Sequence, residues 1–323
     1  MEPVSYVEAI RRALDEEMAR DPRVYVFGED VAVGGPFGAT KGLAERHGAS
    51  RVRNTPISEA AIAGMAVGAA LSGMRPVLEI MFMDFITLGL DALVNQAAKY
   101  RLMSGGQLSV PLVLRTQAGA AGGAAAQHSQ SLEAWLTHVP GLIVVSPSSA
   151  SEAYGLLKSA VRLDDPVVFI EHKRLYASKE AMAFPAAPIP LGHARVARSG
   201  TDATVLTYSG MLGSVLHVCE ERARKGQSIE VIDLRTLAPL DMGTVVKSVS
   251  KTHRALVVHE AVRSGGFGAE LAARLAGEVF DELDAPVLRV GASDAPIPFS
   301  PLLEQSVLPG RAQIHAALDD LFR

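Results

Sequence analysis

The chain has 323 residues, 48% of them hydrophobic, and a formal net charge of −4, which describes a globular protein long enough for two ordinary domains. This weakly acidic balance gives no support for a nucleic-acid partner. The single cysteine, Cys219, excludes an internal disulfide framework and a multi-cysteine metal site.

The chain has no sequence signal for a membrane. Its longest uncharged apolar run, residues 60–74, is too short and too rich in glycine to span a bilayer. The N-terminus carries acids and lacks the apolar core of a signal peptide. We therefore expect a cytoplasmic protein with no membrane partner.

Strand and helix signals alternate through the first half of the chain. An amphipathic helix is expected from Ser5 to Arg20, because Ser5 and Glu8 have the spacing of a capping box. Short apolar strands are expected at 23–27, 76–82, 111–116, 142–146 and 166–171, and helices at 59–73, 85–103 and 147–161.

The alternation pauses and then resumes. Residues 177–191 hold three prolines and no clear period, which is typical of a linker. Beyond it, strands are expected at 203–208, 229–233, 255–259 and 287–290, and helices at 212–225, 241–250, 268–279 and 312–322. The pattern predicts an α/β protein of two open parallel-sheet domains, 1–176 and 192–323, with right-handed crossovers.

Several self-sufficient catalytic motifs are absent. The sequence contains no phosphate-binding loop of the Gly-x-x-x-x-Gly-Lys type, no Gly-x-Ser-x-Gly elbow and no paired histidines at zinc spacing. The chain is therefore enzymatic in build without a complete site of its own.

The stretch Asn54-Thr55-Pro56-Ile57-Ser58-Glu59 leads into a helix of small residues. Ser58 is placed to cap this helix, and Glu59 then falls in its first turn. The helix is apolar all round, so we expect it to be buried. Two interpretations of Glu59 follow: it complements the helix dipole, or it contacts a nitrogen of a buried ligand.

Six segments together resemble one protein family. They are Asn54-Thr55-Pro56-Ile57-Ser58-Glu59, Met81-Phe82-Met83-Asp84-Phe85, Asn95-Gln96-Ala97-Ala98-Lys99-Tyr100, Ala126-Gln127-His128-Ser129-Gln130-Ser131, Val231-Ile232-Asp233-Leu234-Arg235-Thr236 and His259-Glu260. In this order they resemble the beta subunit of thiamine-diphosphate-dependent 2-oxo acid dehydrogenases. The resemblance extends to the acetoin dehydrogenase beta subunit through Met74-Arg75-Pro76-Val77 and Glu171-His172-Lys173.

The resemblance implies a pyrimidine-binding domain followed by a transketolase C-terminal-type domain. It also implies an alpha subunit that holds the diphosphate and Mg²⁺ through a Gly-Asp-Gly motif, which this chain lacks. The expected protein is an oxidoreductase that works in an α2β2 heterotetramer and acylates the lipoyl group of an acyltransferase. Pyruvate, branched-chain 2-oxo acids and acetoin all stay open as substrates.

The resemblance assigns roles to five side chains. Glu59 would hydrogen-bond the pyrimidine ring of thiamine diphosphate, and Phe85 would pack on that ring. Ile57 and Met81 match apolar contacts of the same pocket, and His128 matches a histidine that steers proton transfer during acyl transfer. The ordinary alternative is a core residue for the three apolar side chains and a structural, hydrogen-bonded histidine for His128.

The resemblance also implies a K⁺ site built mainly from backbone carbonyls. The matching positions are Leu112, Ala160, Val161, Leu163 and Asp165. Leu163 and Asp165 depart from the pyruvate-type pattern, and an ordinary helix-to-strand turn is the alternative.

Two rival functions remain open from the sequence. One is a half-chain similar to transketolase or deoxyxylulose-phosphate synthase, which the missing Gly-Asp-Gly motif disfavours. The other is a non-catalytic assembly scaffold of the same fold, which the presence of both Glu59 and His128 disfavours.

Overall fold

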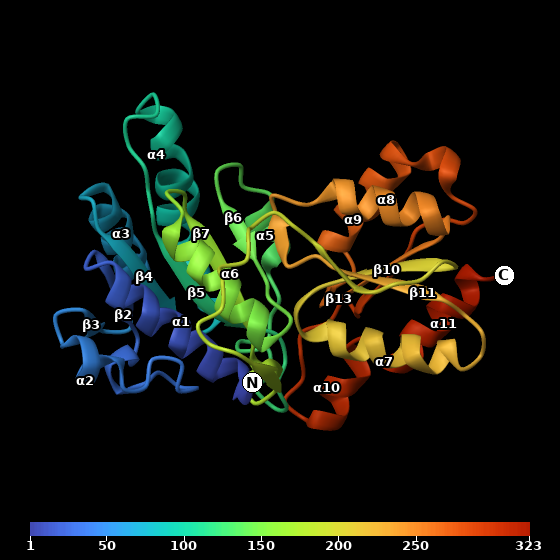
Figure 1. Ribbon diagram of the computed structural model, residues 1–323, viewed down its shortest axis with the longest axis horizontal. Helices are drawn as coiled ribbons and strands as arrows, with labels where there is room; N and C mark the ends of the chain where they lie inside the picture. The colour runs from blue at the N-terminus through green and yellow to red at the C-terminus, as the bar shows by residue number, and fades with distance from the viewer. The chain divides into compact units, whose positions relative to one another are not determined.

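The structure is a computed structural model that describes residues 1–323. The chain forms two compact units (Figure 1): the first comprises Met1–Ala118 and Trp135–Leu191, and the second comprises Gly119–Ala134 and Gly192–Arg323. The segment Gly119–Ala134, expected in the first domain, thus groups by contact with the second unit. None of the helices combines the length and the apolar character that a membrane crossing requires.

The first unit is built on a parallel sheet. Its strands are β2 (Val24–Gly28), β3 (Val52–Asn54), β4 (Arg75–Ile80), β5 (Val113–Ala118), β6 (Ile143–Val145) and β7 (Val167–His172). They lie in the order β6-β7-β5-β4-β2-β3, and every neighbouring pair is parallel. The predicted α/β class with open parallel sheets is confirmed.

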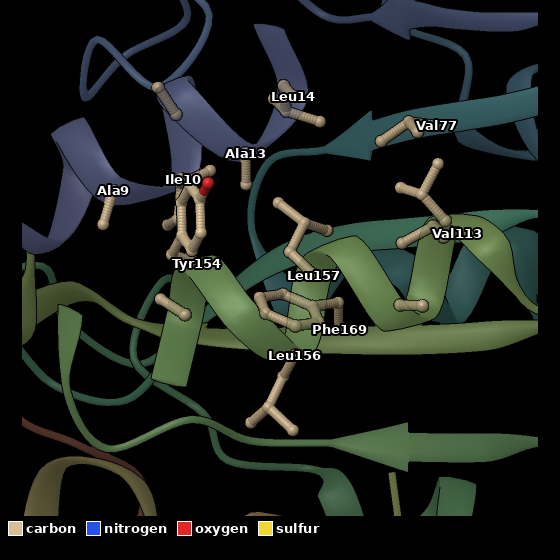
Figure 2. Close-up of a cluster of buried hydrophobic side chains, with 14 of the residues drawn as sticks. Ala9, Ile10, Ala13, Leu14, Val77, Val113, Tyr154, Leu156, Leu157 and Phe169 are labelled. Carbon is tan, nitrogen blue, oxygen red and sulfur yellow. The ribbon is translucent and has the colours of Figure 1, made fainter. Parts of the chain in front are cut away.

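One face of this sheet is covered by α1 (Tyr6–Arg20) and α6 (Ala150–Arg162). Apolar side chains from both helices meet Val77, Val113 and Phe169 of the strands in one buried cluster (Figure 2). The Ser5 side chain accepts a hydrogen bond from the Glu8 N–H at 3.3 Å, as the sequence predicted. Burial of such side chains supplies most of the stabilisation of a fold of this kind.

The other face carries α3 (Glu59–Leu71), and two predictions about this region are wrong. Only one side of α3 is buried, because the sheet covers only one side; Gly64 and Gly68 lie on the exposed side. The helix predicted over 85–103 is divided into η2 (Met83–Gly89), the π-helical η3 (Ala92–Ala97) and α4 (Ala98–Met103). Packing of η2 against α3 accounts for the first break.

The range predicted as a linker contains a strand. β8 (Lys179–Met182) pairs antiparallel with β1 (Glu2–Ser5), so the two ends of the first unit are joined in a small sheet. Neither strand has an alternating pattern long enough to be recognised from sequence. The remaining elements of this unit are η1 (Val31–Val33), α2 (Leu43–His47) and η4 (Lys173–Leu175). A further short helix, α5 (Glu133–Thr137), follows the alanine- and glycine-rich residues 117–126.

The second unit has a five-stranded sheet in the order β14-β13-β10-β11-β9. Its strands are β9 (Arg195–Arg198), β10 (Ala203–Thr207), β11 (Ile229–Asp233), β13 (Ala255–Val262) and β14 (Leu288–Ala292), of which β9 alone is antiparallel to its neighbour. Helices α7 (Leu212–Ala223) and α11 (Arg311–Leu321) pack on one face, and α8 (Met242–Thr252) and α9 (Phe267–Glu278) cover the other (Figure 1). Shorter elements are η5 (Ser209–Met211), β12 (Thr236–Ala238), η6 (Phe280–Glu282) and α10 (Pro301–Val307).

Candidate functional site

The carboxyl ends of β2, β3 and β4 meet at one edge of the first sheet. From β2 the chain adds β3 on one side and then returns to add β4 on the other side. The strand order therefore reverses between β2 and β4. In open α/β sheets a ligand binds outside the carboxyl ends of the strands at such a reversal.

Glu59 is the first residue of α3, which follows β3 at this edge. Its side chain is only 7% exposed, and no hydrogen bond or ion pair to it is found within the chain. Ser58 occupies the position before the helix, but the cap predicted for its side chain is absent. A largely buried carboxylate with no partner in the chain leaves its oxygens available to a donor supplied from outside the chain.

A second carboxylate, Glu29, follows β2 at the same edge. Its Oε2 accepts a hydrogen bond from the Met81 N–H at 3.0 Å, which ties the end of β2 to the end of β4. Its buried Oε1 has no partner. Burial raises the pKa of Glu29 to about 7; the Met81 N–H opposes this rise, and the neighbouring charge of Glu59 adds to it.

The sequence analysis assigned no role to Glu29, which lies two residues after the strand expected at 23–27. A signal was present, because an acid directly after a buried parallel strand lies where ligands bind. The sequence did not show that β2 borders the reversal point, since this depends on the strand order.

Met81 and Phe85 lie in the segment that follows β4, and η2 in this segment packs against α3. Met81 directly follows β4, and Phe85 is in η2. A Cβ atom on Gly89, the last residue of η2, would lie only 3.3 Å from the Glu59 carbonyl oxygen and 3.0 Å from the Ala63 Cβ. Glycine therefore lets η2 approach α3 closely, which brings the predicted aromatic and carboxylate residues to one edge.

Ile57 and His128 have different settings. Ile57 precedes α3 and is 75% exposed, so the chain by itself does not enclose it. His128 belongs to the second unit and is partly buried in a turn, where its N–H lies 3.4 Å from the Ala125 carbonyl oxygen. Its neighbours Gln127 and Ser129 line a cavity of about 630 Å³ within that unit.

A buried ionic cluster joins the strands behind the edge. Arg115 of β5 is fully buried and donates to Glu79 of β4 at 2.7 Å and to Glu171 of β7 at 2.7 and 2.9 Å. Burial alone would lower the pKa of Arg115, but the charges of Glu171 and Glu79 raise it above its ordinary value. Tyr176 also donates to Glu171, at 2.5 Å. The cluster ties β4, which ends at the edge, to β5 and β7.

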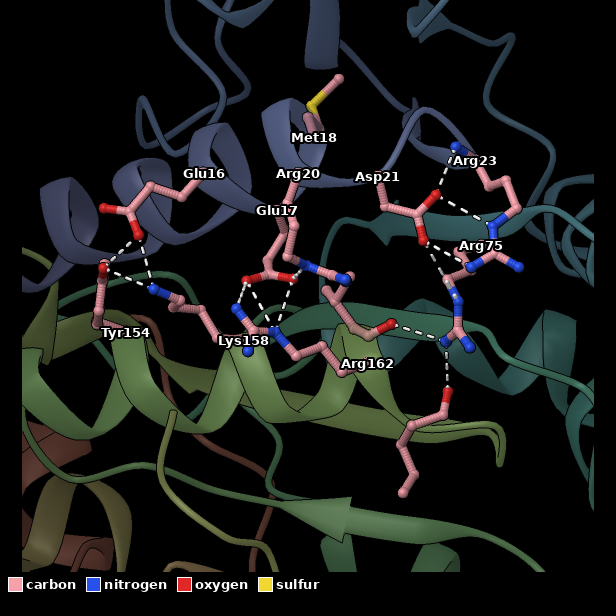
Figure 3. Close-up of polar contacts among 12 residues, drawn as sticks. Glu16, Glu17, Met18, Arg20, Asp21, Arg23, Arg75, Tyr154, Lys158 and Arg162 are labelled. Atoms are coloured by element: carbon pink, nitrogen blue, oxygen red, sulfur yellow. Dashed lines mark hydrogen bonds and ion pairs between the residues drawn. The ribbon is translucent and has the colours of Figure 1, made fainter. Parts of the chain in front are cut away.

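The positions predicted for K⁺ surround the turn between α6 and β7. Arg75 Nη1 donates to the carbonyl oxygens of Val161 at 3.0 Å and Leu163 at 2.8 Å, and the guanidinium also pairs with Asp164 (Figure 3). The other predicted ligands also have partners: the Ala160 carbonyl accepts from the Leu163 N–H, the Leu112 carbonyl accepts from the Val167 N–H, and Asp165 pairs with Arg101. An internal cation thus contacts two of the predicted carbonyls.

No group of three or more His, Cys, Asp or Glu side chains is placed to hold a metal ion. The residues gathered at the edge are instead a buried carboxylate pair and apolar side chains. Carboxylates beside apolar side chains can hydrogen-bond the polar edge of a partly apolar ligand.

Comparison with known proteins defines the class of this two-domain fold. The family described as "Transketolase, pyrimidine binding domain" matches residues 2–179, and "Transketolase, C-terminal domain" matches residues 192–314. A solved structure titled "Split gene transketolase, inactive beta4 tetramer" has a TM-score of 0.83 and covers 98% of each chain at 21% identity. At that identity the likeness concerns the fold alone.

Curated relatives place the chain within this class. The acetoin:2,6-dichlorophenolindophenol oxidoreductase subunit beta of Cupriavidus necator is 44% identical and covers 96% of this chain and 94% of its own length. The pyruvate dehydrogenase E1 component subunit beta of Chaetosphaeridium globosum is 43% identical, with 99% of each chain covered. The chain belongs to the family of pyruvate and acetoin dehydrogenase beta subunits, which confirms the resemblance found from sequence.

Proposed function

We propose that the chain is the beta subunit of the decarboxylating component of a 2-oxo acid or acetoin dehydrogenase complex and binds the aminopyrimidine ring of thiamine diphosphate. The observation that carries this proposal is the buried Glu59 carboxylate, which has no partner in the chain and lies beside the point where the strand order reverses. The pyrimidine-binding domain match and the curated relatives support it.

The cofactor supplies a carbanion that adds to a carbonyl group, and the protein supplies binding and orientation. Glu59 would accept or share a proton with the ring nitrogen, which satisfies the buried carboxylate. Phe85 and Met81 would cover the ring, and Ile57 would contact it where the chain alone leaves Ile57 exposed. His128 would hold or release a proton as the acyl group passes to a lipoyl group.

The remainder of the site would come from other subunits. An alpha subunit would hold the diphosphate and Mg²⁺, since this sequence has no Gly-Asp-Gly motif. We propose an α2β2 heterotetramer, in keeping with the closed symmetry usual for such assemblies, and a lipoyl-bearing acyltransferase as acceptor. A bound K⁺ is not included in this proposal, because Arg75 contacts two of the carbonyls predicted to hold it.

Co-expression with the alpha chain of a 2-oxo acid or acetoin dehydrogenase tests the proposal. Cofactor-dependent turnover of pyruvate, a branched-chain 2-oxo acid and acetoin is measured with 2,6-dichlorophenolindophenol as electron acceptor. We expect turnover of at least one substrate by the pair and none by this chain alone. Glu59→Gln should lower kcat/KM by about a hundredfold or more, because the lost interaction acts on the reacting state.

The sequence leaves open one alternative enzyme, a transketolase half-chain. It predicts ketol transfer between sugar phosphates when the alpha chain is present and no oxidation of 2-oxo acids. A non-catalytic scaffold predicts assembly without turnover, unchanged in Glu59→Gln. Turnover by this chain alone would contradict the subunit proposal itself.

A further inference from the structure

The segment Gly119–Ala134, which is rich in small residues, contains His128. Hydrogen bonds to three carboxylates hold this segment within the second unit. The Ala120 N–H donates to Glu260 Oε1 at 2.7 Å. Further along, the N–H groups of Gly122 and Gly123 donate to the two carboxylate oxygens of Glu304 at 3.0 and 2.9 Å. At the far end, Glu133 accepts from the Tyr208 hydroxyl at 2.7 Å.

The contact with Glu304 depends on an unusual backbone. Gly122 has φ +83° and Gly123 has φ +90°, values in the region that favours glycine. The N–H groups of these two neighbouring residues both donate to one carboxylate, which belongs to the same chain. The Glu304 side chain is only 2% exposed.

Glu304 lies on α10, far from this segment in sequence, so the contact fixes the segment against the body of the second unit. Hydrogen bonds to a charged acceptor are stronger than neutral ones, and here two share a buried acceptor. His128 follows five residues after Gly123, between the Glu304 and Glu133 anchors.

We propose that Glu304 is a positioning residue that holds Gly122 and Gly123 and thereby sets the conformation of the segment that presents His128. The catalytic part of this proposal rests on the proposed function of His128; the structural part does not. Without the carboxylate, the two glycines would sample many backbone conformations, and His128 would lose its fixed position.

Hydrogen–deuterium exchange of the full chain tests the structural part. In Glu304→Ala, the amides of residues 120–128 should exchange about tenfold faster or more, because two charge-assisted bonds are lost. Glu304→Gln keeps one carbonyl acceptor and should give an intermediate rate. Gln305→Ala is the matched control, since Gln305 is exposed on the same helix and should leave exchange unchanged.

The catalytic part is tested by acylation of a lipoyl domain with the complex reconstituted from the alpha chain. Glu304→Ala should lower kcat ten- to a hundredfold, but should have little further effect in a His128→Ala background, because both changes remove one function. A purely structural role would give additive losses in the double variant.

Two results would overturn the proposal. One is exchange of the 120–128 amides that is the same in Glu304→Ala as in the parent chain. The other is faster exchange with unchanged lipoyl acylation, or losses that add to those of His128→Ala. If the parent complex has no activity, the proposed function fails, and the exchange experiment still decides the structural part.

Discussion

Glu29 and Glu59 follow neighbouring parallel strands, yet their settings differ. Glu29 has one oxygen bound by the Met81 N–H and one without a partner, whereas Glu59 has no partner in the chain at all. Both side chains are buried. Two nearby carboxylates without cations repel each other when both are ionised, which is one reason for the raised pKa of Glu29.

The pKa of Glu29 predicts a pH dependence of folding. A carboxyl with a pKa of about 7 in the folded chain and 4.5 ordinarily binds more protons when folded between these values. The contribution of Glu29 to the free energy of unfolding therefore falls as pH rises from about 4.5 to 7. Glu29→Gln should remove this fall.

Urea unfolding of the chain at pH 5, 6 and 7 measures this effect. Glu45→Gln is the control, because this exposed acid is not among the charges that raise the pKa of Glu29. A pH dependence in Glu29→Gln that equals that of the parent chain would contradict the assigned pKa.

Among the elements, η2 depends on a single glycine for its contact with α3. An added Cβ on Gly89 would lie 3.0 Å from the Ala63 Cβ, closer than packed atoms normally approach. Gly89→Ala should lower the free energy of unfolding by about 1–3 kcal/mol, since the two elements must move apart.

Gly64, which lies on α3, provides the matched control. No atom lies within 4 Å of a Cβ added there, so Gly64→Ala should raise the free energy of unfolding of the isolated chain by about 0.5–1 kcal/mol. Both values come from urea unfolding. A Gly89→Ala variant as stable as the parent chain would contradict the close contact.

The turn between α6 and β7 depends on Arg75. This side chain donates to the carbonyls of Val161 and Leu163 and pairs with Asp164. Replacement of Na⁺ by K⁺ should therefore leave the Tm unchanged, because a guanidinium already neutralises this turn. Arg75→Met should lower the free energy of unfolding by about 2–4 kcal/mol, since buried carbonyls lose their donor.

Thermal melts in about 0.1 M KCl and in about 0.1 M NaCl, two solutions of equal ionic strength, make the comparison. Arg23→Met is the control, because its more exposed guanidinium pairs only with Asp21 in the same turn. A rise in Tm specific to K⁺ in the parent chain would restore the cation site predicted from sequence.

For the whole molecule, local patterns predicted the class of fold and most of the regular elements. Strong periodicity located α1, α6 and α7, and continuous apolar runs located the buried strands. The sequence missed what depends on distant contacts: the pairing of β1 with β8, and the grouping of Gly119–Ala134 with the second unit. The two paired strands are more than 170 residues apart, and Gly119–Ala134 contacts residues 75 to 182 positions further along the chain.

The candidate site divides in the same way. The helix start made Glu59 visible, and the family resemblance added Phe85, Met81, Ile57 and His128. Glu29 and Glu304 were missed, because their roles arise from strand order and from a contact across 180 residues of chain. A sequence shows which residues can do chemistry more readily than which residues hold them.

The single cysteine gives a probe of the whole fold. Cys219 is fully buried, and burial raises the pKa of its thiol to about 12. In the native chain at pH 8, reaction with a thiol reagent should be slower than in guanidinium chloride by on the order of a hundredfold or more. Absorbance of the released chromophore measures it, and Cys219→Ala gives the blank. Rapid labelling of the native chain would contradict this burial.

The cluster of Arg115 with Glu79 and Glu171 has a consequence for protein engineering. Arg115 is the counter-charge of both carboxylates, so its removal alone leaves two acids facing each other in the sheet interior, which costs about 3–5 kcal/mol, whereas joint replacement of all three by well-packed apolar side chains can be neutral. A library that randomises the Arg115 codon alone would therefore return mostly destabilised variants. To select new ligand specificities at the edge formed by β2, β3 and β4, the three codons would be randomised together, as one cassette.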